Sequence, residues 1–178
     1  MSDPMSPRPA VSWEAPPPEV GPAPGYEFGG FGARLVAYIV DALILTVGLG
    51  ILGVIGVLLF LRDPGLITSD TVIEDFEPTP LGITLLVITI TIVAVISLLY
   101  FPWFWARGGS TPGMRLFGLV VVRDIDGAPI GWGTALLRLV GWYVSSLVLY
   151  IGFIWIFVDK RRRGWHDLIA GTVVIRRI

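Results

Sequence analysis

Three long apolar runs constrain this chain more than any other feature of its sequence. They cover residues 35–61, 81–105 and 132–158, in a chain of 178 residues that is 54% hydrophobic and 15% charged. About 20 apolar residues suffice for a helix to cross the ~30 Å hydrocarbon core of a bilayer. A run in lipid must be helical, because a lone strand leaves its backbone groups without partners. The sequence therefore predicts an all-α integral membrane helical bundle.

The third run conflicts with a simple crossing of the membrane. Lys and Arg concentrate in residues 107–131, which have three, and in 159–178, which have six, whereas 62–80 have one. Basic segments stay in the cytoplasm, so we expect both termini on that side. Three crossings would export the basic C-terminal segment. We therefore expect 132–158 to be a broken or re-entrant pair of short helices that bends near Gly152; the alternative is a third crossing against the charge rule.

Two short segments outside the runs are typical of strands. "LFGLVVV" at residues 116–122 and "GTVVIRR" at 171–177 are rich in β-branched residues, and "DIDG" at 124–127 predicts a turn. Each strand would have unpaired edges unless it paired with the other. We therefore predict a small two-stranded β element on the cytoplasmic side.

The N-terminal segment differs from the rest in composition. "APPPEVGPAPGYEFGGFG" at residues 15–32 is dominated by Pro and Gly. Proline lacks an amide donor and fixes φ, so we expect polyproline II or disorder rather than a helix or a strand ladder. This divides the chain into a cytoplasmic tail, 1–32, and a transmembrane domain, 33–178. A second interpretation is a docking tail whose aromatic residues bind a partner: Trp13, Tyr26, Phe28 and Phe31.

Two charges accompany the first apolar run. Arg34 precedes it and Asp41 lies seven residues later, on the same face of a helix and about 10 Å further along. Arg34 can extend its charge toward the surface, but an ionised Asp41 costs on the order of 3 kcal/mol in lipid. Asp41 is therefore either a paired structural charge or a group that binds or relays a cation.

Depth in the membrane predicts which charges pair. Arg138 lies about as far into the third run as Asp41 lies into the first, so we predict an Asp41–Arg138 pair. Arg34 at the boundary is then expected to pair with Asp167, just beyond the third run. Arginine suits both sites, because its planar fork binds a carboxylate through two hydrogen bonds.

Several of these residues resemble the RDD family of membrane proteins, which is named for one arginine and two aspartates. The resemblance rests on Arg34, Asp41 and "RRRGWHDLIAGTVVI", supported by "STPGMRLFGLVVVRDIDG" and "ALLRL", and covers residues 31–176. It implies a multi-pass protein of the bacterial plasma (inner) membrane and assigns the second aspartate to Asp167, with Asp159 as a weaker candidate. For function it implies either ion or proton antiport or an accessory role in a larger membrane assembly.

A basic cluster follows the third run. It comprises Lys160, Arg161, Arg162 and Arg163. Such clusters anchor a helix at anionic lipid, so membrane lipids are expected partners.

The remaining motifs indicate no chemistry. The chain has no Cys and one His, which excludes thiol catalysis and Cys-ligated metals, and its net charge of −1 argues against nucleic acid as a partner. "RGGSTPG" at residues 107–113 lacks the lysine of a phosphate-binding loop and predicts a loop leaving the membrane. His166–Asp167 has no nucleophile at a recognisable spacing. We expect no catalytic residues, metal or cofactor.

These observations predict a small non-catalytic membrane protein, an accessory or assembly subunit of a larger complex. A respiratory complex is the first candidate host, and the expected partners are other integral membrane subunits or a second copy of this chain. The alternative is a cation/proton transporter that uses Asp41.

Overall fold

The computed structural model describes residues 22–61 and 79–178. The elements in this part of the chain, in order, are β1 (Tyr26–Phe28), α1 (Phe31–Leu61), α2 (Pro80–Gly108), α3 (Pro112–Leu116), β2 (Leu119–Arg123), α4 (Trp132–Leu147), α5 (Ile151–Ile154), the 3₁₀ helix η1 (Trp155–Phe157), α6 (Trp165–Ala170) and β3 (Thr172–Arg177).

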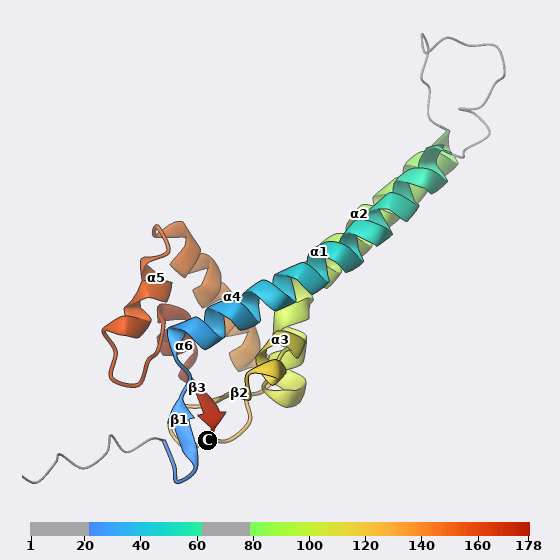
Figure 1. The fold of residues 1–178 in the computed structure, drawn as a ribbon. Coiled ribbons are helices and arrows are strands. Elements are labelled where there is room, and N and C mark those ends of the chain that lie inside the picture. Colours follow the sequence, from blue (N-terminus) through green and yellow to red (C-terminus); the bar gives the residue numbers. More distant parts are fainter. Residues whose placement is uncertain (1–21, 62–78) are drawn as a thin grey trace, which may run out of the picture.

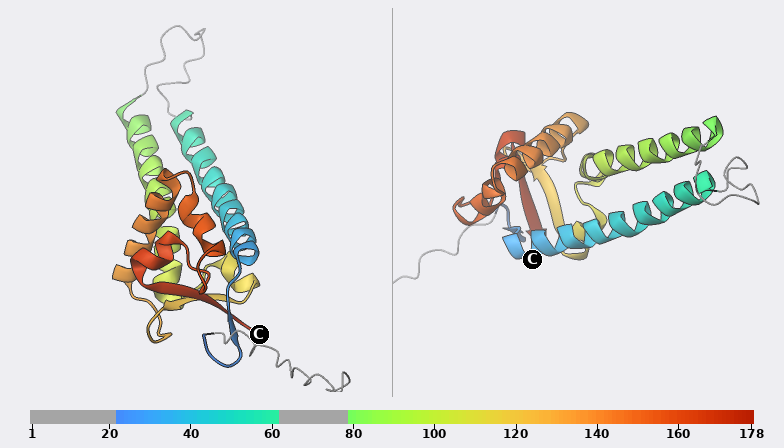
Figure 2. Two further views of the ribbon diagram at one scale, coloured as in Figure 1. Left: turned by 90° about the vertical axis from the view of Figure 1, so that its left-hand side faces the viewer. Right: turned by 90° about the horizontal axis from the view of Figure 1, so that it is seen from above.

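Helices α1 and α2 lie side by side and extend away from a head that the other elements build (Figure 1 and Figure 2). Each is about 45 Å long, and both are long and apolar enough to cross a membrane. Most of their apolar side chains point outward and are exposed. The two predicted spans are therefore confirmed as helices, with ends a few residues beyond the predicted ones.

Helix α2 shows how a β-branched sequence becomes helical. Thr79 caps its start by accepting a hydrogen bond from the amide of Gly82, and Pro80 follows at the first helical position. Hydroxyl groups inside the helix donate to the carbonyl four residues earlier, at Thr84, Thr89, Thr91 and Ser97. No hydroxyl of this set needs a partner outside the helix, which suits a helix surrounded by lipid.

The third apolar run is bent, as predicted. Helix α4 and the α5–η1 segment meet at 111° across a short break. Leu149 and Tyr150 lie in this break with φ of 48° and 60°, a left-handed conformation that ends a helix abruptly. The break therefore lies just before Gly152, near which the bend was predicted. Gly152 instead lies where the two arms touch, because a Cβ there would collide with the side chain of Ser145.

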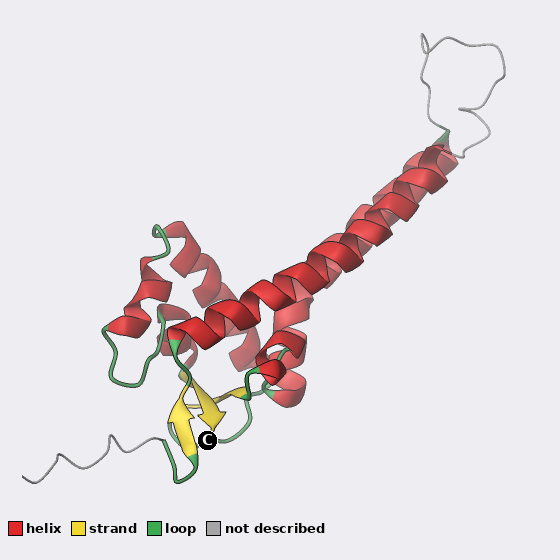
Figure 3. Ribbon diagram, in the orientation of Figure 1, coloured by secondary structure: helices red, strands yellow, loops and turns green. Residues whose placement is uncertain are grey.

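The predicted strands pair, but the sheet has three strands rather than two. Its order is β1-β3-β2 with antiparallel neighbours, and Val174 of β3 lies opposite Val121 of β2 (Figure 3). The predicted turn at residues 124–127 is also confirmed. The third strand, β1, occupies the free edge of β3, with Phe28 opposite Ile175.

Strand β1 corrects the prediction for the N-terminal segment. We expected residues 15–32 to form neither a helix nor a ladder, yet Tyr26–Phe28 form a strand and Phe31 begins α1. The local Pro and Gly signal is overridden here, because the open edge of β3 offers backbone partners that no sequence pattern reveals. Trp13 and the rest of residues 1–21 lie outside the described residues.

The order of the strands in the sheet constrains the path of the third apolar run. Strand β1 precedes α1, β2 follows α2, and β3 follows the bent segment, so all three chain positions lie at one end of the helix pair (Figure 1). The segment from α4 to η1 must therefore leave this end and return to it. This return path agrees with the expected broken or re-entrant pair of short helices.

Candidate functional site: the buried charges of the head

Asp167 is the centre of the larger charge cluster. Its side chain is fully buried, and its two oxygens bind two arginines: Arg34 Nη1 lies 2.6 Å from Oδ2 and Arg138 Nη1 lies 2.7 Å from Oδ1. The Thr172 hydroxyl and the Gly164 amide donate to the same carboxylate at 3.3 and 3.2 Å. One carboxylate thus joins α1, α4 and α6. The predicted Arg34–Asp167 pair is confirmed.

The position of Asp167 follows from the start of α6. Gly164 caps this helix and Asp167 is its third residue, so the carboxylate reaches back to the exposed amide of Gly164. A negative charge in the first turn is also favoured by the helix dipole. The local sequence therefore helps to orient Asp167 independently of the two arginines.

Arg34 connects the cluster to its surroundings. Its Nε donates to the carbonyl of Gly29 at 2.9 Å, and its Nη2 donates to the carbonyl of Arg162 at 2.8 Å. The guanidinium therefore ties the link between β1 and α1 to the basic turn after η1.

The cluster lowers the pKa of both Asp167 and His166, for different physical reasons. Burial alone would raise the pKa of Asp167, but the guanidinium groups of Arg138 and Arg34 outweigh burial and hold the pKa well below its usual range. Burial lowers the pKa of His166 to about 3, so this histidine is neutral at pH 7. At neutral pH the cluster thus carries two positive charges and one negative charge.

Asp41 has different partners from those predicted. Its carboxylate is 1% exposed and accepts three hydrogen bonds: from Thr111 Oγ1 at 2.5 Å, from the Gly113 amide at 2.8 Å and from Tyr100 Oη at 3.0 Å. The predicted Asp41–Arg138 pair is wrong, because Arg138 binds Asp167. Equal depth did not decide the pairing, since Asp41 faces α2 and the start of α3 while Arg138 faces α6.

The partners of Asp41 come from a segment that we predicted to be only a loop. Thr111 caps α3, accepting from the amide of Met114 and donating to Asp41, and Pro112 begins the helix. A side chain at Gly113 would collide with the Ala37 carbonyl and the Asp41 carboxylate, so glycine permits the close approach. The sequence Thr-Pro-Gly is typical of a helix start, so it could have indicated Thr111 and Gly113. Nothing in that sequence indicates that Thr111 binds Asp41, which lies 70 residues earlier.

Asp159, a weaker candidate for the second family aspartate, lies in a separate cluster. Its carboxylate forms an ion pair with the Arg163 side chain at 3.0 Å. It also accepts hydrogen bonds from the backbone amides of Arg161 and Arg163, which closes the turn after η1. The hydrogen bond from Arg163 lowers the pKa of Asp159, and the pKa of Arg163 is raised in return. Asp124 binds Arg161 and Arg163, each at 2.7 Å, and so joins this turn to the end of β2.

A pocket of about 410 Å³ lies beside Asp41 and beside the two arginines that bind Asp167. Arg34, Asp41, Arg138 and His166 contribute to its wall, together with a group of aromatic residues from α1, α2, α4 and α5. Trp142 is central to this group, with ring centroids 5.0 Å from Phe101 and 5.1 Å from Tyr38.

Four buried nitrogens of the wall residues have no hydrogen-bond partner within the described part of the chain. They are Trp105 Nε1, Trp142 Nε1, Arg138 Nε and His166 Nδ1. No group of three His, Cys, Asp or Glu side chains in the described ranges is placed to hold a metal ion. Within the described ranges, the pocket wall therefore combines aromatic surface with buried polar nitrogens and has no cluster of metal ligands.

Comparisons with known proteins agree on one family. The sequence model of the RDD family matches residues 28–171. The uncharacterized protein YxaI of Bacillus subtilis (strain 168) is 30% identical over 148 residues, which are 82% of this chain and 95% of the relative. The proline-rich antigen of Mycobacterium leprae (strain TN) is 28% identical over 146 residues, which are 80% of this chain and 58% of that protein.

A shorter match joins the chain to the proline-rich antigen homolog of Mycobacterium tuberculosis (strain ATCC 25618 / H37Rv). It is 27% identical over 88 residues, covering 47% of this chain and 37% of the homolog. The chain thus spans little more than half of the Mycobacterium leprae protein and less of its homolog. No solved structure matches the chain.

Proposed function

Because this chain belongs to the RDD family, we propose that it is a small non-catalytic membrane protein whose family charges hold its fold together. In this proposal it serves as an accessory or assembly subunit of a larger membrane complex. The observation that carries the proposal is the state of the three family residues, Arg34, Asp41 and Asp167, each of which is engaged by groups of the same chain.

Asp41 supports a structural role most directly. A group that carries ions must exchange its partners, whereas Asp41 is buried and accepts from two hydroxyls and one backbone amide. These donors compensate the desolvation of the carboxylate at one fixed position. They come from α2 and the start of α3, so the hydrogen bonds fasten the end of α2 to α1.

Asp167 supports the same role by a different means. A buried carboxylate that binds two arginines is expensive to separate from them, because each unpaired charge would remain in a medium of low dielectric constant. Movement of a cation through this site would require that separation. The geometry therefore favours a structural role for Asp167, which holds the helices together, over a role in a path for ions.

The surface of the helix pair supports a membrane environment and lateral partners. Apolar side chains cover nearly all of the outer faces of α1 and α2, and lipid or neighbouring helices must cover them. The Lys and Arg residues of the described part gather on the head and at the adjoining helix ends, so we place the head and the N-terminal tail in the cytoplasm of a bacterium. A respiratory complex is the first host to check, and a second copy of the chain is the other candidate partner.

A purification in mild detergent, analysed by quantitative mass spectrometry, tests the proposal. We expect stoichiometric recovery with subunits of a larger membrane complex, and the same recovery for Asp41→Asn wherever that variant folds. The opposing result is recovery as a homo-oligomer that conducts cations in liposomes in a pH-dependent manner. If Asp41→Asn abolished that flux without loss of folded protein, the transporter alternative would replace this proposal.

A further inference from the structure

The aromatic pocket is bordered by exposed apolar side chains. Its volume of about 410 Å³ lies within the ~300–1,000 Å³ of typical ligand pockets. Leu35, Tyr150 and Ile154 line it and are also 44%, 63% and 54% exposed, so they form an apolar rim. An apolar chain in the surrounding membrane could therefore enter without passing a polar barrier.

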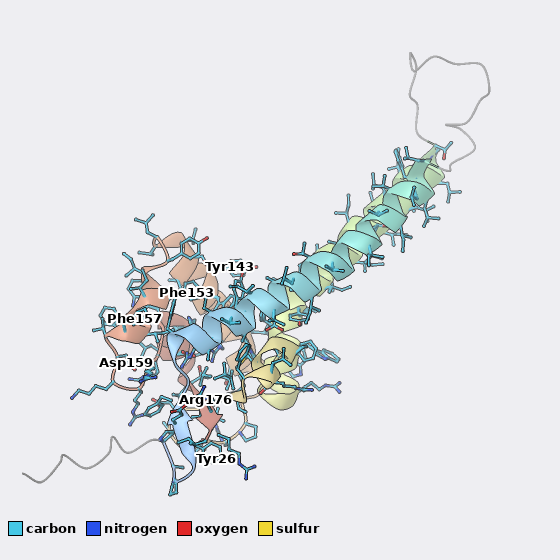
Figure 4. The ribbon with its side chains drawn as sticks, viewed as in Figure 1. Tyr26, Tyr143, Phe153, Phe157, Asp159 and Arg176 are labelled. Carbon is cyan, nitrogen blue, oxygen red and sulfur yellow. The ribbon has the colours of Figure 1, made fainter. Side chains whose placement is uncertain are left out.

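A second hollow adjoins this pocket. Phe31 and Ile156 line both, and the second hollow continues past Phe157 to Lys160 and Arg162. Figure 4 shows Phe157 and Asp159 close together on the side of the head where η1 ends. The surface thus changes from aromatic to basic over a short distance.

Two cations of the basic turn are unengaged. Arg161 and Arg163 bind Asp124, and Arg163 also binds Asp159. The side chains of Lys160 and Arg162 make no ion pair or hydrogen bond with any other residue that the structure describes. Both are exposed at the second hollow.

The turn fixes the position of these cations. Arg162 has a φ of 53°, a conformation that few non-glycine residues adopt, and its carbonyl accepts from Arg34 at 2.8 Å. Its Nη1 lies next to Gly30, 3.1 Å from where a Cβ would be. A strained backbone that presents an unpaired guanidinium beside a hollow suits recognition of a phosphate.

We propose that the head binds one anionic phospholipid, with an acyl chain in the aromatic pocket and the phosphate between Lys160 and Arg162. Phe31 and Ile156 line both hollows, so a ligand that is apolar at one end and anionic at the other fits the two neighbouring hollows. The aromatic side chains of the pocket wall, among them Trp105 and Trp142, suit an acyl chain, and the exposed Lys160 and Arg162 suit its phosphate.

Native mass spectrometry on the full chain, purified and delipidated in detergent, tests this site. The probes are phosphatidylglycerol, phosphatidylcholine with the same acyl chains, and inorganic phosphate. We expect one phosphatidylglycerol per chain, with phosphatidylcholine retained at least tenfold more weakly. Equal retention of the two lipids, or no retained lipid, would overturn the proposal. The proposal would also be overturned if inorganic phosphate raised the thermal stability as much as phosphatidylglycerol does. That result would indicate an anion site that needs no acyl chain.

A pair of matched variants tests the two cations. Lys160→Gln with Arg162→Asn should weaken retention of phosphatidylglycerol about 30-fold, as expected for two basic groups at an anionic headgroup. The control, Arg115→Gln with Arg177→Gln, removes the same charge from exposed positions outside both hollows and should change retention less than twofold. Thermal unfolding without lipid verifies that both proteins are folded. Equal weakening by the two variants would mean that net charge alone attracts the lipid, and the site would be rejected.

Discussion

Arg34 and Asp167 lie 133 residues apart in the sequence, and their side chains meet at 2.6 Å inside the head. The contact joins the first turns of the first long helix to the short helix before the last strand. Arg138 completes the cluster from the re-entrant segment. The contacts among the three charged residues therefore form only when three distant parts of the chain are assembled.

Loss of Asp167 should be the most damaging charge change. Asp167→Asn leaves the buried Arg138 and the partly buried Arg34 without an anion, and we expect a loss of about 3–5 kcal/mol in the free energy of unfolding. Denaturation in detergent measures it. The matched control is Asp126→Asn, which breaks the exposed Arg123–Asp126 pair and should cost about 0–1 kcal/mol. Equal losses in the two variants would mean that the cluster contributes no more than a surface pair.

Asp41 should be coupled to Thr111 and not to Arg138. In a double-mutant cycle, Asp41→Ala and Thr111→Val should be non-additive by about 1–3 kcal/mol, because they remove the two ends of one hydrogen bond. Asp41→Ala and Arg138→Ala should add to within about 0.5 kcal/mol. Coupling in the second cycle, with none in the first, would restore the pairing expected from depth.

Gly113→Ala should disrupt the contact between α3 and α1. The added Cβ would meet the Ala37 carbonyl and the Asp41 carboxylate, and neither can move far. We expect a loss of about 1–3 kcal/mol, typical of overpacking, measured as reduced thermal stability in detergent. Gly133→Ala is the control, because Gly133 lies in the first turn of α4 and its Cβ would meet open space.

Stability should fall on mild acidification because of His166. The folded pKa of about 3 lies below the unfolded value of about 6.5, so between these values the unfolded chain binds a proton that the folded chain excludes. The free energy of unfolding therefore decreases as the pH falls from about 6.5 toward 3. Asp167 adds a further loss only below the unfolded pKa of about 3.9, since its folded pKa is also lowered.

Denaturation curves at pH 7 and pH 5 test this dependence. The wild-type midpoint should be lower at pH 5, and His166→Gln should reduce the difference between the two values. An unchanged difference in His166→Gln would assign the pH dependence to another group.

The re-entrant path can be tested by labelling, because the chain contains no cysteine. In intact cells, a membrane-impermeant maleimide should label Leu61→Cys at the far end of α1. It should label Asp126→Cys and Lys160→Cys only after the membrane is opened. Labelling of Lys160→Cys in intact cells would show that the third run crosses.

The sequence predicted those features that local pattern decides. The two long helices follow from the length of their apolar runs, and β2 and β3 follow from their β-branched residues and their need for each other. The Arg34–Asp167 pair also followed, because both residues lie at the boundary of an apolar run.

The remaining features depend on contacts that local pattern does not encode. The partners of Asp41 lie in a short helix start, and the choice of Thr111 over Arg138 depends on which side of α1 faces α3. Strand β1 forms only because β3 has a free edge beside it. In both cases a contact with a segment that is distant in the sequence determines the local structure.

The sheet order has a consequence for the synthesis of this protein. Strand β3 lies between β1 and β2 but follows both in the chain, and Asp167 likewise follows both of its arginines. While the ribosome works through the first 164 residues, β1 and β2 have no strand between them, and Arg34 and Arg138 have no shared anion. One short stretch, residues 165–177, then supplies both the central strand and the carboxylate that binds the two arginines. A chain interrupted before that stretch would have two strands without the strand that joins them and two arginines without their shared carboxylate.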